Sequence, residues 1–410
     1  MVHATFGQKI VIGAIAALLL GASAVADDQR VQQAASWLER ADRLLERGEQ
    51  RGAAEAYWQA AWLDPDADEA YRRATLLYDR LGPAATDAQR DRLAREFEAG
   101  TYLRQSRHYL MVYDGPHAWA DTRVNLLEMA EANFYRRLRE AGLRPLPLRR
   151  PLEVVLFSEH ADFADYAGRV DQLDRSWAAG YYSSRSNRIV MFNYHTSPVL
   201  EKLVVQMRKA EGEVQRWQSE VGYDRRARGR LAAAQRQLAT VRQRYETIAA
   251  WGNIQQTLHE AAHQLAFNSG IQRRGVQYPM WFSEGLATAF ETTHPATGYG
   301  PHRINDQRRQ QLRQLGRKNA LLPLDRLVAL TLPPDHDRQR DAAYAQSWAL
   351  FHYLFNHRSD QLARYVRYMA AQSPGKRDAD QLRADFEQAF GPVEQVRDAY
   401  DRHVAELLDR

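Results

Sequence analysis

Between residues 200 and 250, apolar residues recur at alternating spacings of three and four. Heptad spacing of this kind predicts helices that pack along one apolar seam. The two runs are separated by a region that holds Gly222 and Gly229, so we expect an antiparallel helical hairpin. A stiff intramolecular arm is favoured over a dimerisation device, because the two seams already satisfy each other. The runs are Leu200, Leu203, Met207, Ala210, Val214, Trp217 and Val221, then Leu231, Ala234, Leu238, Val241, Tyr245 and Ile248.

Directly after this hairpin, residues 259–263 read HEAAH. We expect them to lie on a helix that Asn253 caps. Residues four apart on a helix share a face, so the imidazoles of His259 and His263 can bind one metal ion at about 2.0 Å each. Glu260 lies about 100° round the helix from His259 and can act as a general base without being a ligand.

A catalytic zinc needs a third protein ligand and one open position. Glu284, 21 residues after His263, is the candidate, on a second predicted helix that contains Trp281 and Phe282. Because the chain has no cysteine, any metal must be held by histidine and carboxylate. Glu291 is seven residues after Glu284, so we expect it on the same helical face, where it could orient a ligand histidine; an ordinary surface glutamate is the alternative.

These two motifs resemble those of the gluzincin, or peptidase MA-like, metallopeptidases, which combine two histidines in a five-residue motif with a glutamate ligand on the next helix. The resemblance covers roughly residues 150–370 and implies a small mixed sheet beside a helical lobe. It also implies one Zn²⁺ per chain. The residues around Glu284 resemble the aminopeptidase branch, in which a tyrosine stabilises the oxyanion. The resemblance gives that role to Tyr344. The alternative is that Tyr344 only packs in the core.

In gluzincins an edge strand above the metal helix pairs with the substrate backbone, and Gly180, Tyr181 and Tyr182 stand where this strand is expected. The segment 178–182 has no acidic residue that could hold a free amino terminus. This departure from the aminopeptidase pattern favours an endopeptidase.

The region before the hairpin mixes strand and helix patterns. His108–Tyr113 and Leu152–Phe157 are rich in β-branched and aromatic residues and predict strands, with an amphipathic helix over Thr122–Ala141 between them. Gly180–Tyr182 and Arg188–Phe192 flank a polar stretch and predict a β-hairpin. We therefore expect an α+β fold.

Residues 27–104 are expected to form a separate helical module, and residues 105–410 the metallopeptidase-like domain with 200–250 inserted. The module resembles one tetratricopeptide repeat and could bind a protein partner. An ordinary helical hairpin with no partner is the alternative. The repeat-like positions are Trp37, Ala41, Leu44, Gly48, Ala53, Tyr57, Ala60 and Pro65.

Residues 1–26 have a short basic start, the apolar stretch Ile10–Leu20 and a small-residue end, which together are typical of a secretory signal peptide. We expect cleavage after Ala26 and a periplasmic or secreted mature protein, with a retained anchor as the alternative. No later segment is apolar enough to span a membrane. Acidic and basic residues interleave and the net charge is only +5, so no nucleic-acid partner is expected.

The residues favour a zinc peptidase acting on a peptide or protein substrate. Two alternatives stay open at this point. One is a catalytically silent metallopeptidase fold that binds envelope proteins through its helical module, and the other is a structural envelope protein without metal. Loss of cleavage with zinc retained in Glu260→Gln would separate the enzyme from both.

Overall fold

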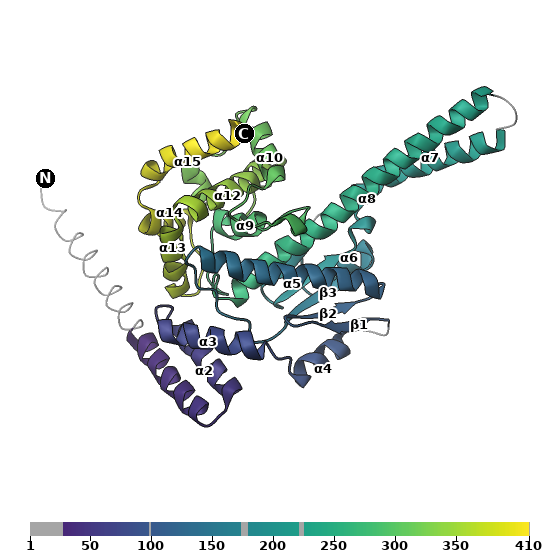
Figure 1. The fold of residues 1–410 in the computed structure, drawn as a ribbon. Helices are drawn as coiled ribbons and strands as arrows, with labels where there is room; N and C mark the ends of the chain where they lie inside the picture. The colour runs from purple at the N-terminus through teal and green to yellow at the C-terminus, as the bar shows by residue number, and fades with distance from the viewer. Residues whose placement is uncertain (1–27, 98–99, 174–178, 221–224, 410) are drawn as a thin grey trace, which may run out of the picture. The chain divides into compact units, whose positions relative to one another are not determined.

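The structure, a computed structural model, describes residues 28–97, 100–173, 179–220 and 225–409 (Figure 1). The predicted signal peptide lies outside these residues. Within them, no helix combines the length and the apolarity needed to cross a bilayer. The chain divides into two compact units: residues up to Pro83 with Arg144–Arg149, and Ala84–Leu143 with Arg150–Arg410. Residues 84–104, which the predicted boundary places in the N-terminal module, group with the second unit.

The first unit is a small helical bundle with a core of its own. Residues 28–46 are helical and are followed by α2 (Gln50–Leu63) and α3 (Asp68–Leu81). Gly48 turns the chain into α2 with φ 77°, a left-handed conformation that glycine adopts without strain. The resemblance to a tetratricopeptide repeat stays a prediction. The core is rich in small side chains and includes Ala41, Ala53, Tyr57, Ala60, Ala70 and Ala74.

The second unit contains a five-stranded mixed sheet in the order β1-β2-β3-β5-β4. The three central strands are parallel, and each edge strand runs antiparallel to its neighbour. The α+β class and the predicted strands and β-hairpin are confirmed. The strands are β1 (Tyr102–Gln105), β2 (Tyr109–Tyr113), β3 (Leu152–Phe157), β4 (Gly180–Ser183) and β5 (Arg188–Phe192).

Helices cover both faces of this sheet. On one face α4 and α6 pack against Leu110, Val155 and Val190, and on the other lie α5 and the long helix α8. Successive residues of a strand point to opposite faces, so only every second residue of β4 can face α8. These helices are α4 (Asp87–Glu96), α5 (His117–Glu140), α6 (His160–Arg169) and α8 (Arg225–Asn268).

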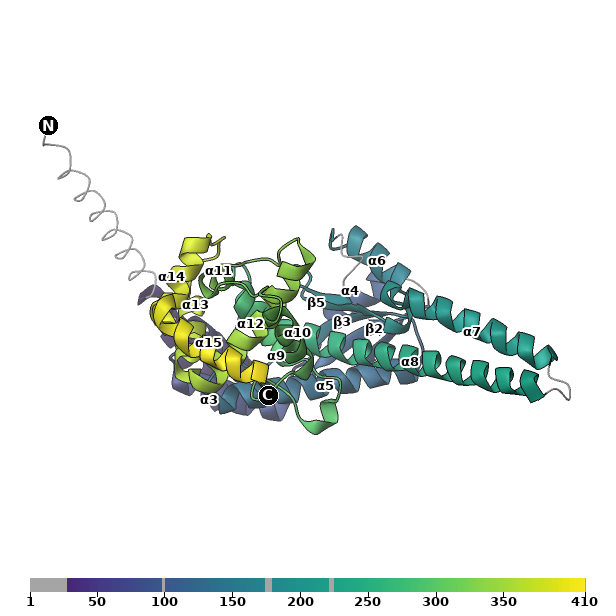
Figure 2. The same ribbon diagram turned by 90° about the horizontal axis from the view of Figure 1, so that it is seen from above.

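The heptad-patterned segment forms a helical hairpin of α7 (Glu201–Glu220) and the first half of α8. Figures 1 and 2 both show it extending away from the sheet and from the C-terminal helices of its unit. Leu203, Ala210 and Val214 of α7 are buried, as the seam predicts. Of the two glycines expected at the connection, Gly222 lies outside the described residues and Gly229 is inside α8.

The helix cap predicted at Asn253 is wrong, because α8 runs unbroken from the hairpin through the HEAAH residues. The Asn253 side-chain oxygen instead accepts hydrogen bonds from the Tyr194 backbone N–H at 2.8 Å and from the buried Arg123 guanidinium. The Cβ of any larger residue at Gly252 would overlap the Tyr194 ring. These contacts fix α8 to the rest of its unit about two turns before His259.

The remaining helices form a lobe around a core of aromatic side chains. Trp281 and Phe282 contact Tyr365 at ring-centroid distances of 5.1 and 5.3 Å. Gly285 lets α9 approach α12, since a Cβ there would lie only 2.5 Å from the Ser347 carbonyl oxygen. The helices are α9 (Met280–Ala289), α10 (Asp306–Gly316), α11 (Leu324–Val328), α12 (Asp337–His357), α13 (Ser359–Ala371), α14 (Ala379–Phe390) and α15 (Val393–Asp409).

Candidate metal centre

The two histidines project from α8 into a cavity at the junction of sheet and lobe. Leu258, Ala262 and Leu265 are buried and hold this part of α8 against the core. The imidazoles of His259 and His263 therefore leave the same face, and their Nε2 atoms lie 3.2 Å apart. The sequence spacing alone determines this pairing, because residues four apart on a helix are neighbours.

Glu284 reaches the two histidines from α9. Its neighbours Trp281 and Phe282 are fully buried, so the helix is fixed with the Glu284 side chain toward α8. The Oε2 atom of Glu284 lies 3.3 Å from His259 Nε2, and Oε1 lies 3.6 Å from His263 Nε2. His259, His263 and Glu284 are a group of residues whose ligand atoms all lie within 4.8 Å of one another.

These separations fit one zinc ion. Ligand atoms that bind zinc at about 2.0–2.1 Å with tetrahedral angles lie roughly 3.3 Å from each other. The two Nε2 atoms lie 3.2 Å apart and Glu284 Oε2 lies 3.3 Å from that of His259, whereas the 3.6 Å separation from His263 is to the other carboxylate oxygen, Oε1. The Oε2 atom of Glu284 is also buried without a hydrogen-bond partner among the described residues, as expected of an atom reserved for a ligand.

The charges around the site favour a cation. Burial alone would raise the pKa of Glu284, but His263 and His259 beside it hold that pKa well below its usual range. Burial would lower the pKa of His259, yet Glu284 and Glu291 raise it well above its usual value. Surroundings that favour a positive charge on an imidazole also favour a metal ion between ionised carboxylates.

Glu291 contacts the second ring nitrogen of His259, with Nδ1 and Oε1 2.8 Å apart. If Nδ1 donates its proton to this carboxylate, the lone pair of Nε2 points at the three-ligand site. The shared helical face predicted for Glu284 and Glu291 is wrong, because α9 ends at Ala289. The chain turns after the helix and brings the carboxylate back over His259.

Arg308, at the start of α10, is a site residue that the sequence does not reveal. Its Nε and Nη2 atoms donate to the two carboxylate oxygens of Glu291 at 2.9 and 2.8 Å. Its guanidinium also lies over the Tyr344 ring, 5.6 Å from the centroid. Nothing in the local sequence distinguishes Arg308 from Arg309, which pairs with Asp306 on the surface. Only the fold shows which arginine faces inward.

One cavity of about 450 Å³ is lined by His259, His263, Glu284 and Glu291. Glu260, next to His259 on α8, faces this space, and so does Tyr344 of α12. Gly180 and Tyr182 of the edge strand β4 form one wall. Tyr181, predicted to bind substrate with them, points to the opposite sheet face, where its hydroxyl donates to Asp171 at 2.9 Å. Side chains alternate along a strand, so Tyr181 could meet a substrate strand only through its backbone, and its role stays a prediction.

The residues of the candidate metal centre lie within a region that matches a protein family of unknown function. Residues 253–376 match a family described as "Protein of unknown function (DUF1570)". The match contains His259, Glu260, His263, Glu284 and Tyr344, and it leaves out the first unit and the α7–α8 hairpin. A search among curated proteins found no match.

Proposed function

We propose that this protein is an exported zinc-dependent peptidase of the gluzincin type. The observation that supports this most is the convergence of His259, His263 and Glu284, whose ligand atoms lie within 4.8 Å of one another, with Glu260 facing the same cavity. Export rests on the signal peptide predicted at residues 1–26. These three residues would hold the ion, and a set of three protein ligands is typical of catalytic rather than structural zinc.

Bound zinc would lower the pKa of a water molecule toward about 7 and polarise the substrate carbonyl. In this scheme Glu260 takes a proton from the attacking water and passes it to the leaving amine. The Tyr344 phenol donates a hydrogen bond to the oxygen on which negative charge develops. Glu291 holds His259 in the tautomer that presents Nε2, and Arg308 fixes both Glu291 and the Tyr344 ring in position.

The cavity suits an extended peptide rather than a free amino terminus. β4 is at the edge of the sheet and can take an added strand, with Gly180 allowing close backbone approach. Among the described residues that line the cavity, the acidic ones are Glu260, Glu284 and Glu291. We assign the first to the base and the second to the metal, while the third is paired with Arg308. None of the carboxylates on the described lining is left for a terminal ammonium, which supports an endopeptidase.

The test is cleavage of an unfolded protein substrate by the zinc-loaded mature chain. Glu260→Gln is expected to keep zinc and lose at least about a thousandfold in kcat, because the base is removed while the ligands stay. Glu394→Gln, on the exposed face of α15, is the matched control and should cleave like the wild type. Equal cleavage by Glu260→Gln and the wild type would contradict the proposal.

A binding scaffold is the second candidate, because the first unit has its own core and lies outside the family match. On this view, Glu260→Gln would leave the cellular phenotype intact while deletion of residues 30–100 removes it. The opposite pattern supports the enzyme.

A further inference from the structure

One end of the metal cavity is aromatic. There Tyr182 of β4 and Phe267 of α8 stack on each other, with ring centroids 5.5 Å apart and ring planes at 25°. Both residues line the cavity, and both are only partly buried. Phe267 is four residues after His263 on α8, so it lies about one helical turn beyond this candidate metal ligand. An apolar surface therefore adjoins the place where a substrate bond would be cleaved.

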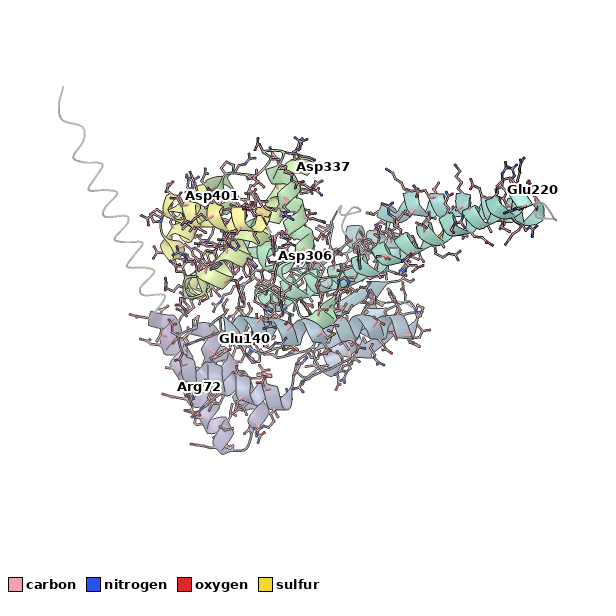
Figure 3. The ribbon with its side chains drawn as sticks, turned by 45° about the horizontal axis from the view of Figure 1, so that its top comes forward. Arg72, Glu140, Glu220, Asp306, Asp337 and Asp401 are labelled. Atoms are coloured by element: carbon pink, nitrogen blue, oxygen red, sulfur yellow. The ribbon has the colours of Figure 1, made fainter. Side chains whose placement is uncertain are left out.

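The opposite end of the cavity is mainly polar. It lies beside the start of α10, which Asp306 marks in Figure 3. There the side-chain amide of Gln255 donates a hydrogen bond to that of Gln307, and both residues line the cavity. Tyr194 lines this end too, but its ring packs against the backbone of α8 at Gly252. A large apolar side chain placed here would cover amide groups that water otherwise solvates.

The Tyr182 side chain is fixed by hydrogen bonds at its hydroxyl. The hydroxyl donates to the Asn187 side-chain oxygen at 3.0 Å and accepts from the Arg274 guanidinium at 3.1 Å. It therefore needs no hydrogen-bond partner on a substrate, and the ring can present its apolar atoms. Phe267 belongs to the helix that holds the two histidines, so its place relative to the metal is fixed as well. A surface that is already formed in this way loses little conformational entropy when a ligand binds.

The direction of β4 indicates which side of the cleaved bond meets the rings. Gly180 lies against Gln256, three residues before His259, since a Cβ at Gly180 would be 3.3 Å from Gln256 Cγ. Two residues later, Tyr182 reaches Phe267, which follows the second histidine. β4 therefore passes the metal centre in the same direction as α8. A substrate strand added antiparallel to β4, the more stable pairing, passes the rings before it reaches the metal.

We propose that the Tyr182–Phe267 pair binds an aromatic or large aliphatic side chain on the substrate residue directly before the cleaved bond. This inference rests on the proposed peptidase function and adds a substrate class to it. Aromatic side chains gain most from such a surface, because they bury a large apolar area and make favourable offset or edge contacts with other rings. We expect at least about a tenfold preference over alanine, which is the scale of discrimination by apolar contacts.

The experiment compares two blocked octapeptides of glycine and alanine that differ only in having phenylalanine or alanine at the fourth position. The zinc-loaded wild type should cleave the phenylalanine peptide after its fourth residue, with a kcat/KM at least about tenfold higher than for the alanine peptide. Phe267→Ala should lower this ratio to about threefold or less, because it removes the ring next to the metal. The ratio is measured on one preparation, so it does not depend on the fraction of the variant that is folded.

Two control variants should keep the ratio of the wild type. Tyr182→Phe keeps both rings and removes only the hydroxyl, and Gln307→Ala changes the polar end of the cavity. Three results would overturn the proposal: equal kcat/KM values for the two peptides, cleavage before the phenylalanine, or an unchanged ratio in Phe267→Ala.

Peptide binding to zinc-loaded Glu260→Gln separates this inference from the proposed function. Calorimetry should show at least about tenfold tighter binding of the phenylalanine peptide, and adding Phe267→Ala should remove the difference. That result, with neither peptide cleaved by the wild type, would support the aromatic site and contradict the peptidase. Cleavage of both peptides at equal rates would contradict the aromatic site and support the peptidase. Equal or undetectable binding of the two peptides, without cleavage, would overturn both.

Discussion

Replacing Glu291 should weaken zinc binding through His259 and lower the free energy of unfolding through Arg308, and the two effects can be measured separately. Glu291→Ala removes the acceptor of His259 Nδ1, 2.8 Å away, and both hydrogen-bond acceptors of the Arg308 Nε and Nη2 atoms. Loss of the carboxylate that orients a ligand histidine typically weakens metal binding 10- to 100-fold. The Arg308 side chain is only 16% exposed, so leaving it unpaired should cost about 3–5 kcal/mol of stability.

The two effects can be measured on the same variants. Zinc affinity is obtained by competition with a chromogenic chelator, and the free energy of unfolding by urea denaturation of the metal-free protein, so that bound zinc does not add to it. Arg308→Met combined with Glu291→Ala removes the buried charge together with its partner. This double variant should recover more than about 1 kcal/mol over the sum of the single changes, while its zinc affinity stays low.

Wild-type zinc affinity in Glu291→Ala would show that Glu291 does not orient His259 for metal binding. Glu291→Gln is the matched control, because the amide oxygen can still accept a hydrogen bond from His259 Nδ1. It should lose stability through the unpaired Arg308 but less than about tenfold in zinc affinity.

Three further outcomes are expected. Tyr344→Phe should lower kcat by about 10²–10³ with little change in KM, as loss of an oxyanion donor does; an unchanged kcat would remove Tyr344 from the site. Burial, and then the neighbouring His403, lower the pKa of His352 to about 3, so the unfolded chain binds a proton that the folded chain does not. Stability should be full above pH 6.5 and fall toward pH 3 by up to roughly 4–5 kcal/mol, and urea titrations of His352→Gln should lack this loss. Gly285→Ala should cost about 1–3 kcal/mol of unfolding free energy through overlap with α12, whereas Gly168→Ala on α6, with open space at its Cβ, should be neutral or stabilising.

Local periodicity explains why much of the site could be predicted. Helix geometry alone puts His259 and His263 on one face, and the apolar residues around Glu284 indicate that its helix is buried. The sheet and the hairpin follow from patterns that extend over whole elements. Each of these patterns lies within a single helix or strand, so it can be recognised without knowledge of the tertiary structure.

The errors arise where tertiary contacts decide. Asn253 is a good capping residue, but Tyr194 and Arg123 occupy its side chain and α8 continues through it. The helical face predicted to be shared by Glu284 and Glu291 does not exist, because α9 ends at Ala289. Arg308 follows a loop whose course no local pattern specifies.

Zinc content per chain after loading and dialysis tests directly whether His259, His263 and Glu284 hold one zinc ion. The wild type and Glu260→Gln should each retain one zinc, while His263→Ala and Glu284→Ala should retain none under the same conditions. A wild type that releases all its zinc, or a Glu284→Ala variant that keeps the metal with unchanged affinity, would show that these three residues do not form a zinc site.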